Sequence, residues 1–87
     1  MPEKYFIYIS KHIRKSLLKI PSPWIGRIEK NIDKLELDPL LGIKMQGDLS
    51  NKRKIVVWPY RIIYQINQKE KSIVIVEVKH RGNVSYD

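Results

Sequence analysis

KRKIVVWPYRIIYQIN, residues 52–67, decides the fold of this chain, because it places basic, aromatic and β-branched residues on both sides of a Trp-Pro interruption. The apolar runs Ile55–Val57 and Ile62–Ile66 have the composition of β-strands. Pro59 lacks an amide donor and is tolerated near a turn or at a sheet edge rather than in mid-strand. The stretch therefore predicts a β-hairpin that carries cations on one face.

The strand-like composition continues on both sides of this hairpin. Ser72–Lys79 follows a short polar turn, which predicts a three-stranded antiparallel meander over residues 52–57, 60–67 and 72–79. Near the N-terminus, Tyr5–Ile9 is rich in aromatic and β-branched residues and predicts a first strand that is buried on both faces. Leu40–Ser50 is predicted to be a loop, with Ile43 and Met45 as candidates to anchor it in the core.

Two helices are predicted between the first strand and the loop. Ser10 is a suitable N-cap, and apolar residues then recur at helical spacing until Pro21. Ser22 is predicted to cap a second helix with Pro23 in its first turn, and this helix ends before Pro39. So short a connection favours an antiparallel helical hairpin over one sheet face. The expected fold is α+β, in the order β-α-α-β-β-β, with a mainly antiparallel sheet.

Composition narrows the class of protein and of partner. The 87 residues suit one domain, spanning 1–87, and their 17 Lys and Arg against 9 Asp and Glu give a net charge of +8. Such a surplus attracts polyanions, with nucleic acid first, although an anionic membrane surface or an acidic protein would also fit. The apolar runs are too short to span a bilayer. The lack of cysteine and of a signal peptide favours the cytoplasm, and no metal or cofactor motif is found.

The alternation of side chains along strands predicts a cationic face. Lys52 and Lys54 share one face of their strand, and Arg61 shares a face with Ile63 and Gln65 in the next strand. The same alternation groups Arg81 with Glu77 and Lys79 on one side of the last predicted strand. Arg81 therefore joins the cluster if the pairing of this strand with its neighbour allows.

Such a cluster can hold a phosphate, and crowding of like charges disfavours the charged form of a lysine, which can then act as a base. RNA cleavage by its own 2′-hydroxyl fits: a base removes that proton, arginines stabilise the charged phosphorane, and an acid protonates the leaving oxygen. On spacing alone, solvated surface charges are the more common explanation.

Two segments resemble a known family. IKMQGDLSNKRKIVVWPYRIIYQIN, residues 43–67, and VIVEVKHRGNVSY, residues 74–86, together resemble the RelE/ParE superfamily of toxins from bacterial and archaeal toxin-antitoxin pairs. The shared pattern is a K-x-x-G loop, basic residues, a YRiiY strand, an apolar strand and HR with a terminal tyrosine. The chain differs at Val56, where many relatives carry another basic residue, and at Trp58-Pro59.

The RelE branch of this family implies a function and a set of residues. Its members enter the ribosomal A site and cut mRNA, and a cognate antitoxin binds them in a hetero-oligomer. By position, Lys54 would be the general base beside Lys52, Arg61 would stabilise the phosphate, Arg81 would act on the leaving group and Tyr86 would stack on a base. RNA contacts would come from Lys44, Arg53 and His80. The ParE branch implies instead a DNA gyrase inhibitor without nuclease activity, and an RNA-binding domain without catalysis is a third hypothesis.

Overall fold

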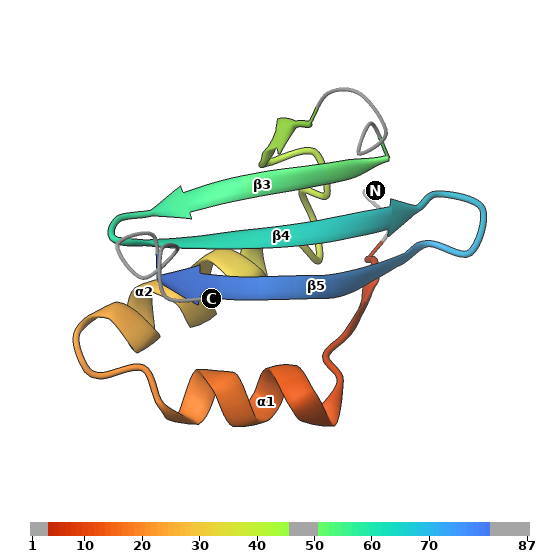
Figure 1. The fold of residues 1–87 in the computed structure, drawn as a ribbon. Coiled ribbons are helices and arrows are strands. Elements are labelled where there is room, and N and C mark those ends of the chain that lie inside the picture. The colour runs from red at the N-terminus through yellow and green to blue at the C-terminus, as the bar shows by residue number, and fades with distance from the viewer. Residues whose placement is uncertain (1–3, 46–50, 81–87) are drawn as a thin grey trace.

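The computed structural model describes residues 4–45 and 51–80, which form two helices and a five-stranded sheet (Figure 1). The strands lie in the order β1-β5-β4-β3-β2. The elements are β1 (Phe6–Tyr8), α1 (Lys11–Leu18), α2 (Trp24–Lys34), β2 (Ile43–Lys44), β3 (Lys52–Val57), β4 (Tyr60–Asn67) and β5 (Ser72–His80). No helix in the described part of the chain is long and apolar enough to cross a membrane.

The predicted meander is confirmed. β3 pairs with β4 and β4 pairs with β5, both antiparallel, and the bounds of β3 and β4 are those predicted. β1 lies parallel to β5 at one edge, so the sheet is mixed but mainly antiparallel, and the α+β fold class is confirmed.

The helices begin and end largely where the sequence predicts. The hydroxyl of Ser10 accepts a hydrogen bond from the Ile13 amide at 3.2 Å, which confirms Ser10 as the N-cap of α1. The prediction for α2 was wrong in one detail, because the N-cap is Pro23, with no side-chain hydrogen bond, and not Ser22. Proline suits this position because its missing amide would have no partner in a first helical turn.

The core lies between the helices and one face of the sheet. Ile13 of α1 and Ile28, Ile32 and Leu35 from α2 and its C-cap pack in one cluster with sheet residues. The sheet contributes Ile55, Val57, Ile62, Tyr64, Ile73 and Ile75. The described helices leave the other face of the sheet without a covering layer, and we call it the open face.

Two expectations for the edges of the sheet were wrong. β1 is not buried on both faces, because Phe6 and Tyr8 are exposed while Ile7 packs against the core. Within the predicted loop, Ile43–Lys44 forms the short strand β2 along β3, and Ile43 is exposed rather than anchored in the core. Both errors concern edge strands, whose outer faces have no neighbouring layer.

A β-bulge in the pairing of β4 with β5 reverses the alternation of β5. Ile63 pairs with Glu77 but the next residue, Tyr64, pairs with Ile75, so Val76 has no opposite partner. Ile75 consequently faces the core, whereas Glu77 faces away from it. Strict alternation would have placed both side chains on one face.

Candidate functional site

The register brings the predicted cations of β3 and β4 together on the open face. Lys54 pairs with Ile63, while Arg61 pairs with Val56, and directly paired residues project from the same face. Ile63 therefore shares a face with both cations. Lys54 and Arg61 are diagonal neighbours, whose Cα atoms are typically about 7–8 Å apart.

Arg61 has an unsatisfied donor on this face. Its Nε atom is buried and has no hydrogen-bond acceptor within the described residues. Two residues along the strand and on the same face, Ile63 is only 8% exposed although it does not belong to the core cluster. A partly buried guanidinium beside an apolar side chain binds an anion more strongly than one in water, because the local dielectric constant is lower.

Lys79 adds a further cation that was not among the predicted site residues. It pairs directly with Arg61, and its ammonium group lies 3.9 Å from the carboxylate of Glu77. Glu77 is thus the counter-charge of a predominantly basic set. The basic face, as we use the term, comprises Lys52, Lys54, Arg61 and Lys79.

The three predicted RNA-contacting residues lie on the other side of the sheet. Arg53 pairs with the buried Tyr64 on the core side, and Lys44 pairs with Arg53. His80 pairs with Tyr60 and packs edge-on against its ring, with centroids 5.0 Å apart. These three residues are therefore not part of the basic face. The predicted Arg81 and Tyr86 lie outside the described residues.

Arg53 and Tyr64 hold the segment that leads into β2. The Tyr64 hydroxyl donates to the Pro39 carbonyl at 2.8 Å and accepts from the Gly42 amide at 2.8 Å. Nη1 of Arg53 donates to the Gly42 carbonyl at 2.7 Å. Burial raises the pKa of the Tyr64 phenol, the Gly42 hydrogen bond and the Arg53 charge lower it, and the Asp38 carboxylate adds to the rise.

Gly42 is needed at this point because the backbone and Tyr64 approach it closely. A Cβ atom here would lie 2.7 Å from the Lys54 carbonyl oxygen and 2.9 Å from the Tyr64 hydroxyl. We call the hydrogen bonds that Tyr64 makes to Pro39 and Gly42 the tether. It was not predicted from the sequence, although Gly42 and Tyr64, the second tyrosine of the YRiiY motif, carry it.

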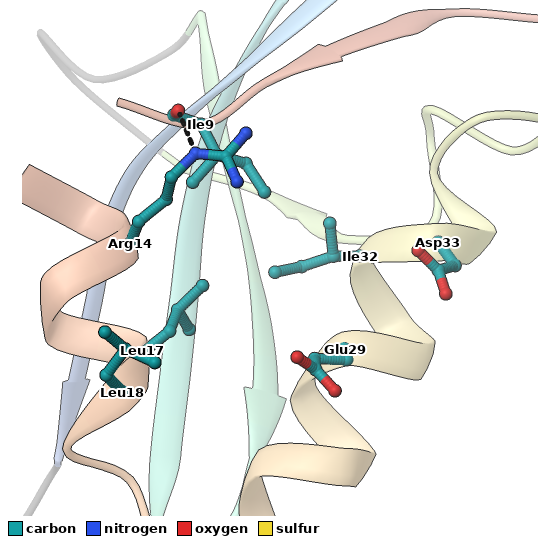
Figure 2. A pocket seen from close by; sticks show the side chains of 7 residues that line it. All are labelled: Ile9, Arg14, Leu17, Leu18, Glu29, Ile32 and Asp33. Atoms are coloured by element: carbon teal, nitrogen blue, oxygen red, sulfur yellow. Dashed lines mark hydrogen bonds between the residues drawn. The ribbon is translucent and has the colours of Figure 1, made fainter. Parts of the chain in front are cut away.

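The helix side of the molecule holds a pocket whose lining differs in charge from the basic face. A pocket of about 560 Å³ lies between α1 and α2 (Figure 2). Leu17, Leu18 and Ile32 supply apolar walls, Glu29 and Asp33 supply carboxylates, and Nε of Arg14 donates to the Ile9 carbonyl at 3.2 Å (Figure 2). The two carboxylates do not suit a polyanion, so the basic face remains the candidate site. Within the described residues, no three His, Asp or Glu side chains gather as metal ligands.

The comparisons with known proteins agree with this fold. The model of a family described as the ParE toxin of the type II toxin-antitoxin system parDE matches residues 7–84. No curated protein sequence matches the chain significantly.

Solved structures similar to the chain come from several organisms. The archaeal RelE-RelB complex from Pyrococcus horikoshii is 30% identical, with a TM-score of 0.75 over 93% of this chain and 99% of that one. The toxin-antitoxin complex RelBE2 from Mycobacterium tuberculosis is 24% identical, with a TM-score of 0.78 over 90% and 99% of the two chains. The isolated Escherichia coli RelE toxin is 20% identical, with a TM-score of 0.76 over 87% and 83%. The chain therefore belongs to the RelE/ParE superfamily of toxins of type II toxin-antitoxin systems.

Proposed function

We propose that this toxin is an mRNA endoribonuclease that acts on translating ribosomes and is neutralised by a cognate antitoxin. The observation that carries the proposal is the buried Nε of Arg61, which lacks an acceptor in the described residues and lies on a face with three lysines. A buried donor without a partner costs free energy, so its retention favours a ligand that supplies the acceptor. A phosphate oxygen is such an acceptor.

The basic face suits cleavage by the 2′-hydroxyl route. In this scheme Lys54 takes the 2′ proton, the 2′ oxygen attacks the adjacent phosphorus, and the bond to the 5′ oxygen breaks as that oxygen gains a proton. Lys52 and Arg61 stabilise the negative charge that develops on the phosphate. We assign proton donation to Arg81 and base stacking to Tyr86 on family resemblance alone, since both lie outside the described residues.

The proposed antitoxin partner rests on the similar structures, two of which are complexes of a RelE-type toxin with its antitoxin. A ParE-like inhibitor of DNA gyrase is the second candidate function. The family model that matches the chain favours it, and so does Val56, an apolar side chain opposite Arg61 on the open face.

Induction of the toxin in growing cells separates these functions. An endoribonuclease of the proposed kind should produce mRNA breaks in phase with codons on translating ribosomes, and sequencing of RNA 5′ ends detects them. Co-expression of the antitoxin should suppress the breaks. DNA breaks with intact mRNA would overturn the proposal in favour of gyrase, and a lack of both kinds of break would indicate a domain without catalysis.

A further inference from the structure

The edge strand β1 presents two aromatic side chains to solvent. Tyr5, Ile7 and Ile9 pack against the core, whereas Phe6 and Tyr8 point the other way and are 67% and 54% exposed. Outward positions of an edge strand are normally polar or charged, because an exposed apolar edge promotes aggregation. Two large aromatic rings in these positions therefore need an explanation.

The register places these rings on the same face as the cations. In β5, Ser72 pairs with Phe6 and Val74 pairs with Tyr8. Val74 also pairs with Gln65 of β4, and Gln65 pairs with Lys52 of β3. Tyr8 and Lys52 are thus the two ends of one row across four strands. Three inter-strand spacings separate them by roughly 15 Å.

The surface between the rings and the cations is continuous. Val74 is 41% exposed and Gln65 is half-buried, so the row from Tyr8 to Lys52 runs over an apolar and then a polar residue. Among the described open-face residues of β3, β4 and β5, only Glu77 carries a negative charge, and Lys79 lies beside it. The face as a whole attracts a polyanion, and its aromatic end offers π-surfaces.

We propose that Phe6 and Tyr8 form a stacking platform for unpaired bases of an RNA strand whose backbone lies on the basic face. Single-stranded nucleic acids are bound by this combination, in which cations follow the backbone and aromatic rings stack on bases. The inference rests on RNA as the ligand of the proposed function, but it does not require cleavage.

The main alternative occupant is a protein segment, because β1 is the last strand of the sheet and its outer edge can accept another strand. Such pairing uses backbone groups and apolar contacts and needs no cations nearby. The shared row with Lys52 favours RNA.

Binding of a short single-stranded RNA with 2′-O-methyl groups tests the platform, because this RNA lacks the attacking hydroxyl. Fluorescence anisotropy with the full-length protein should show that Tyr8→Ala and Phe6→Ala each weaken binding about 5- to 100-fold. Tyr8→Phe keeps the ring and should bind like the wild type. Leu18→Ala removes an even more exposed apolar side chain from α1, outside the open face, and serves as the control.

An oligonucleotide with abasic positions identifies stacking as the cause. Without bases to stack on, the wild type and Tyr8→Ala should bind with equal affinity. Three results would each overturn the inference. They are an unchanged RNA affinity of both alanine variants, an equal loss of affinity by Tyr8→Ala on abasic RNA, and a wild type that does not bind the RNA. Loss of antitoxin binding with intact RNA binding would assign the patch to a protein strand. A protein that shows this aromatic dependence but cuts no mRNA would overturn the proposed function and leave the platform standing.

Discussion

Two arginines of the central hairpin differ in how their guanidinium groups are satisfied. Arg53 of β3 faces the core side and donates from Nη1 to the carbonyls of Gly42, at 2.7 Å, and Leu40, at 3.5 Å. Arg61 of β4 faces the open side, and its buried Nε finds no acceptor in the described residues. One arginine holds a backbone segment in place, and the other leaves a buried donor unsatisfied.

This difference shows how one basic stretch serves both stability and function. A satisfied buried donor contributes to folding, whereas an unsatisfied one opposes it and persists where a ligand supplies the missing bond. Alternation along the strands separates the two roles, because Arg53 and Lys54 are neighbours in sequence but project from opposite faces. Four substitutions probe the contrast.

Matched substitutions of the two arginines by methionine should give opposite results. Methionine keeps much of the aliphatic stem but removes the charge and the donors. Arg61→Met should lower mRNA cleavage by about 100-fold or more, the scale of losing one donor to transition-state charge. Its Tm should equal or exceed that of the wild type, since a desolvated donor has been removed. Arg53→Met should cost about 1–2 kcal/mol of unfolding free energy by losing its hydrogen bonds.

Cleavage of a reporter mRNA on ribosomes and thermal unfolding by circular dichroism measure the two effects. A clear fall in Tm for Arg61→Met, together with normal cleavage, would show that Arg61 is structural and that the contrast is wrong.

Tyr64→Phe should weaken the core side without touching the open face. The change leaves the Gly42 amide and the Pro39 carbonyl without the phenol, at a cost of about 2–4 kcal/mol. Urea unfolding at neutral pH measures this loss. A variant as stable as the wild type would show that the tether contributes nothing.

The same variant has a pH signature. Because the pKa of Tyr64 is raised on folding, its contribution is complete below the unfolded value of about 10 and is lost as the pH rises toward the folded value. The stability difference between the wild type and Tyr64→Phe should therefore shrink above about pH 10. A difference that grows with pH would contradict the raised pKa.

Gly42→Ala should lower the stability less than Tyr64→Phe does, by about 1–3 kcal/mol, because the new methyl group meets the Lys54 carbonyl and Tyr64. Part of the strain can relax through the Tyr64 ring. Thermal unfolding tests this, with Gly26→Ala as the control, since a Cβ at Gly26 in α2 meets nothing within 4 Å. The control should be neutral or slightly stabilising, because alanine favours helix. Equal Tm values for the two variants would contradict the close approach.

Much of the fold follows from local patterns in the sequence. The bounds of β3 and β4, the Ser10 cap and the shared face of Lys54 and Arg61 all depend on residues within one or two elements. The edges of the sheet were harder to predict. Tyr5–Ile9 is apolar or aromatic at every position, so composition alone could not show which side chains would face solvent.

The roles of particular site residues depended on distant contacts. The family resemblance predicts an RNA contact for Arg53, and the structure adds that this side chain donates to backbone carbonyls in a segment more than ten residues earlier in the chain. Lys79 enters the basic face only because it pairs with Arg61. The periodicity of a single strand identifies neither the acceptors of Arg53 nor the partner of Lys79.

By itself, the sequence determined the meander, the two helices and the cationic side of β3 and β4, the last because alternation within a strand is a property of the backbone. Only the tertiary structure decided which side chains of β5 face the core and which face the open side. There a bulge turns Ile75 into the core while Glu77 and Lys79 face the open side. The physical reason is that strict alternation would put Ile73, Ile75, Glu77 and Lys79 on one face of β5. With Ile73 and Ile75 buried against the helices, the two charged residues would then face the core instead of lying on the same face as Arg61. One extra residue, Val76, reconciles the two placements.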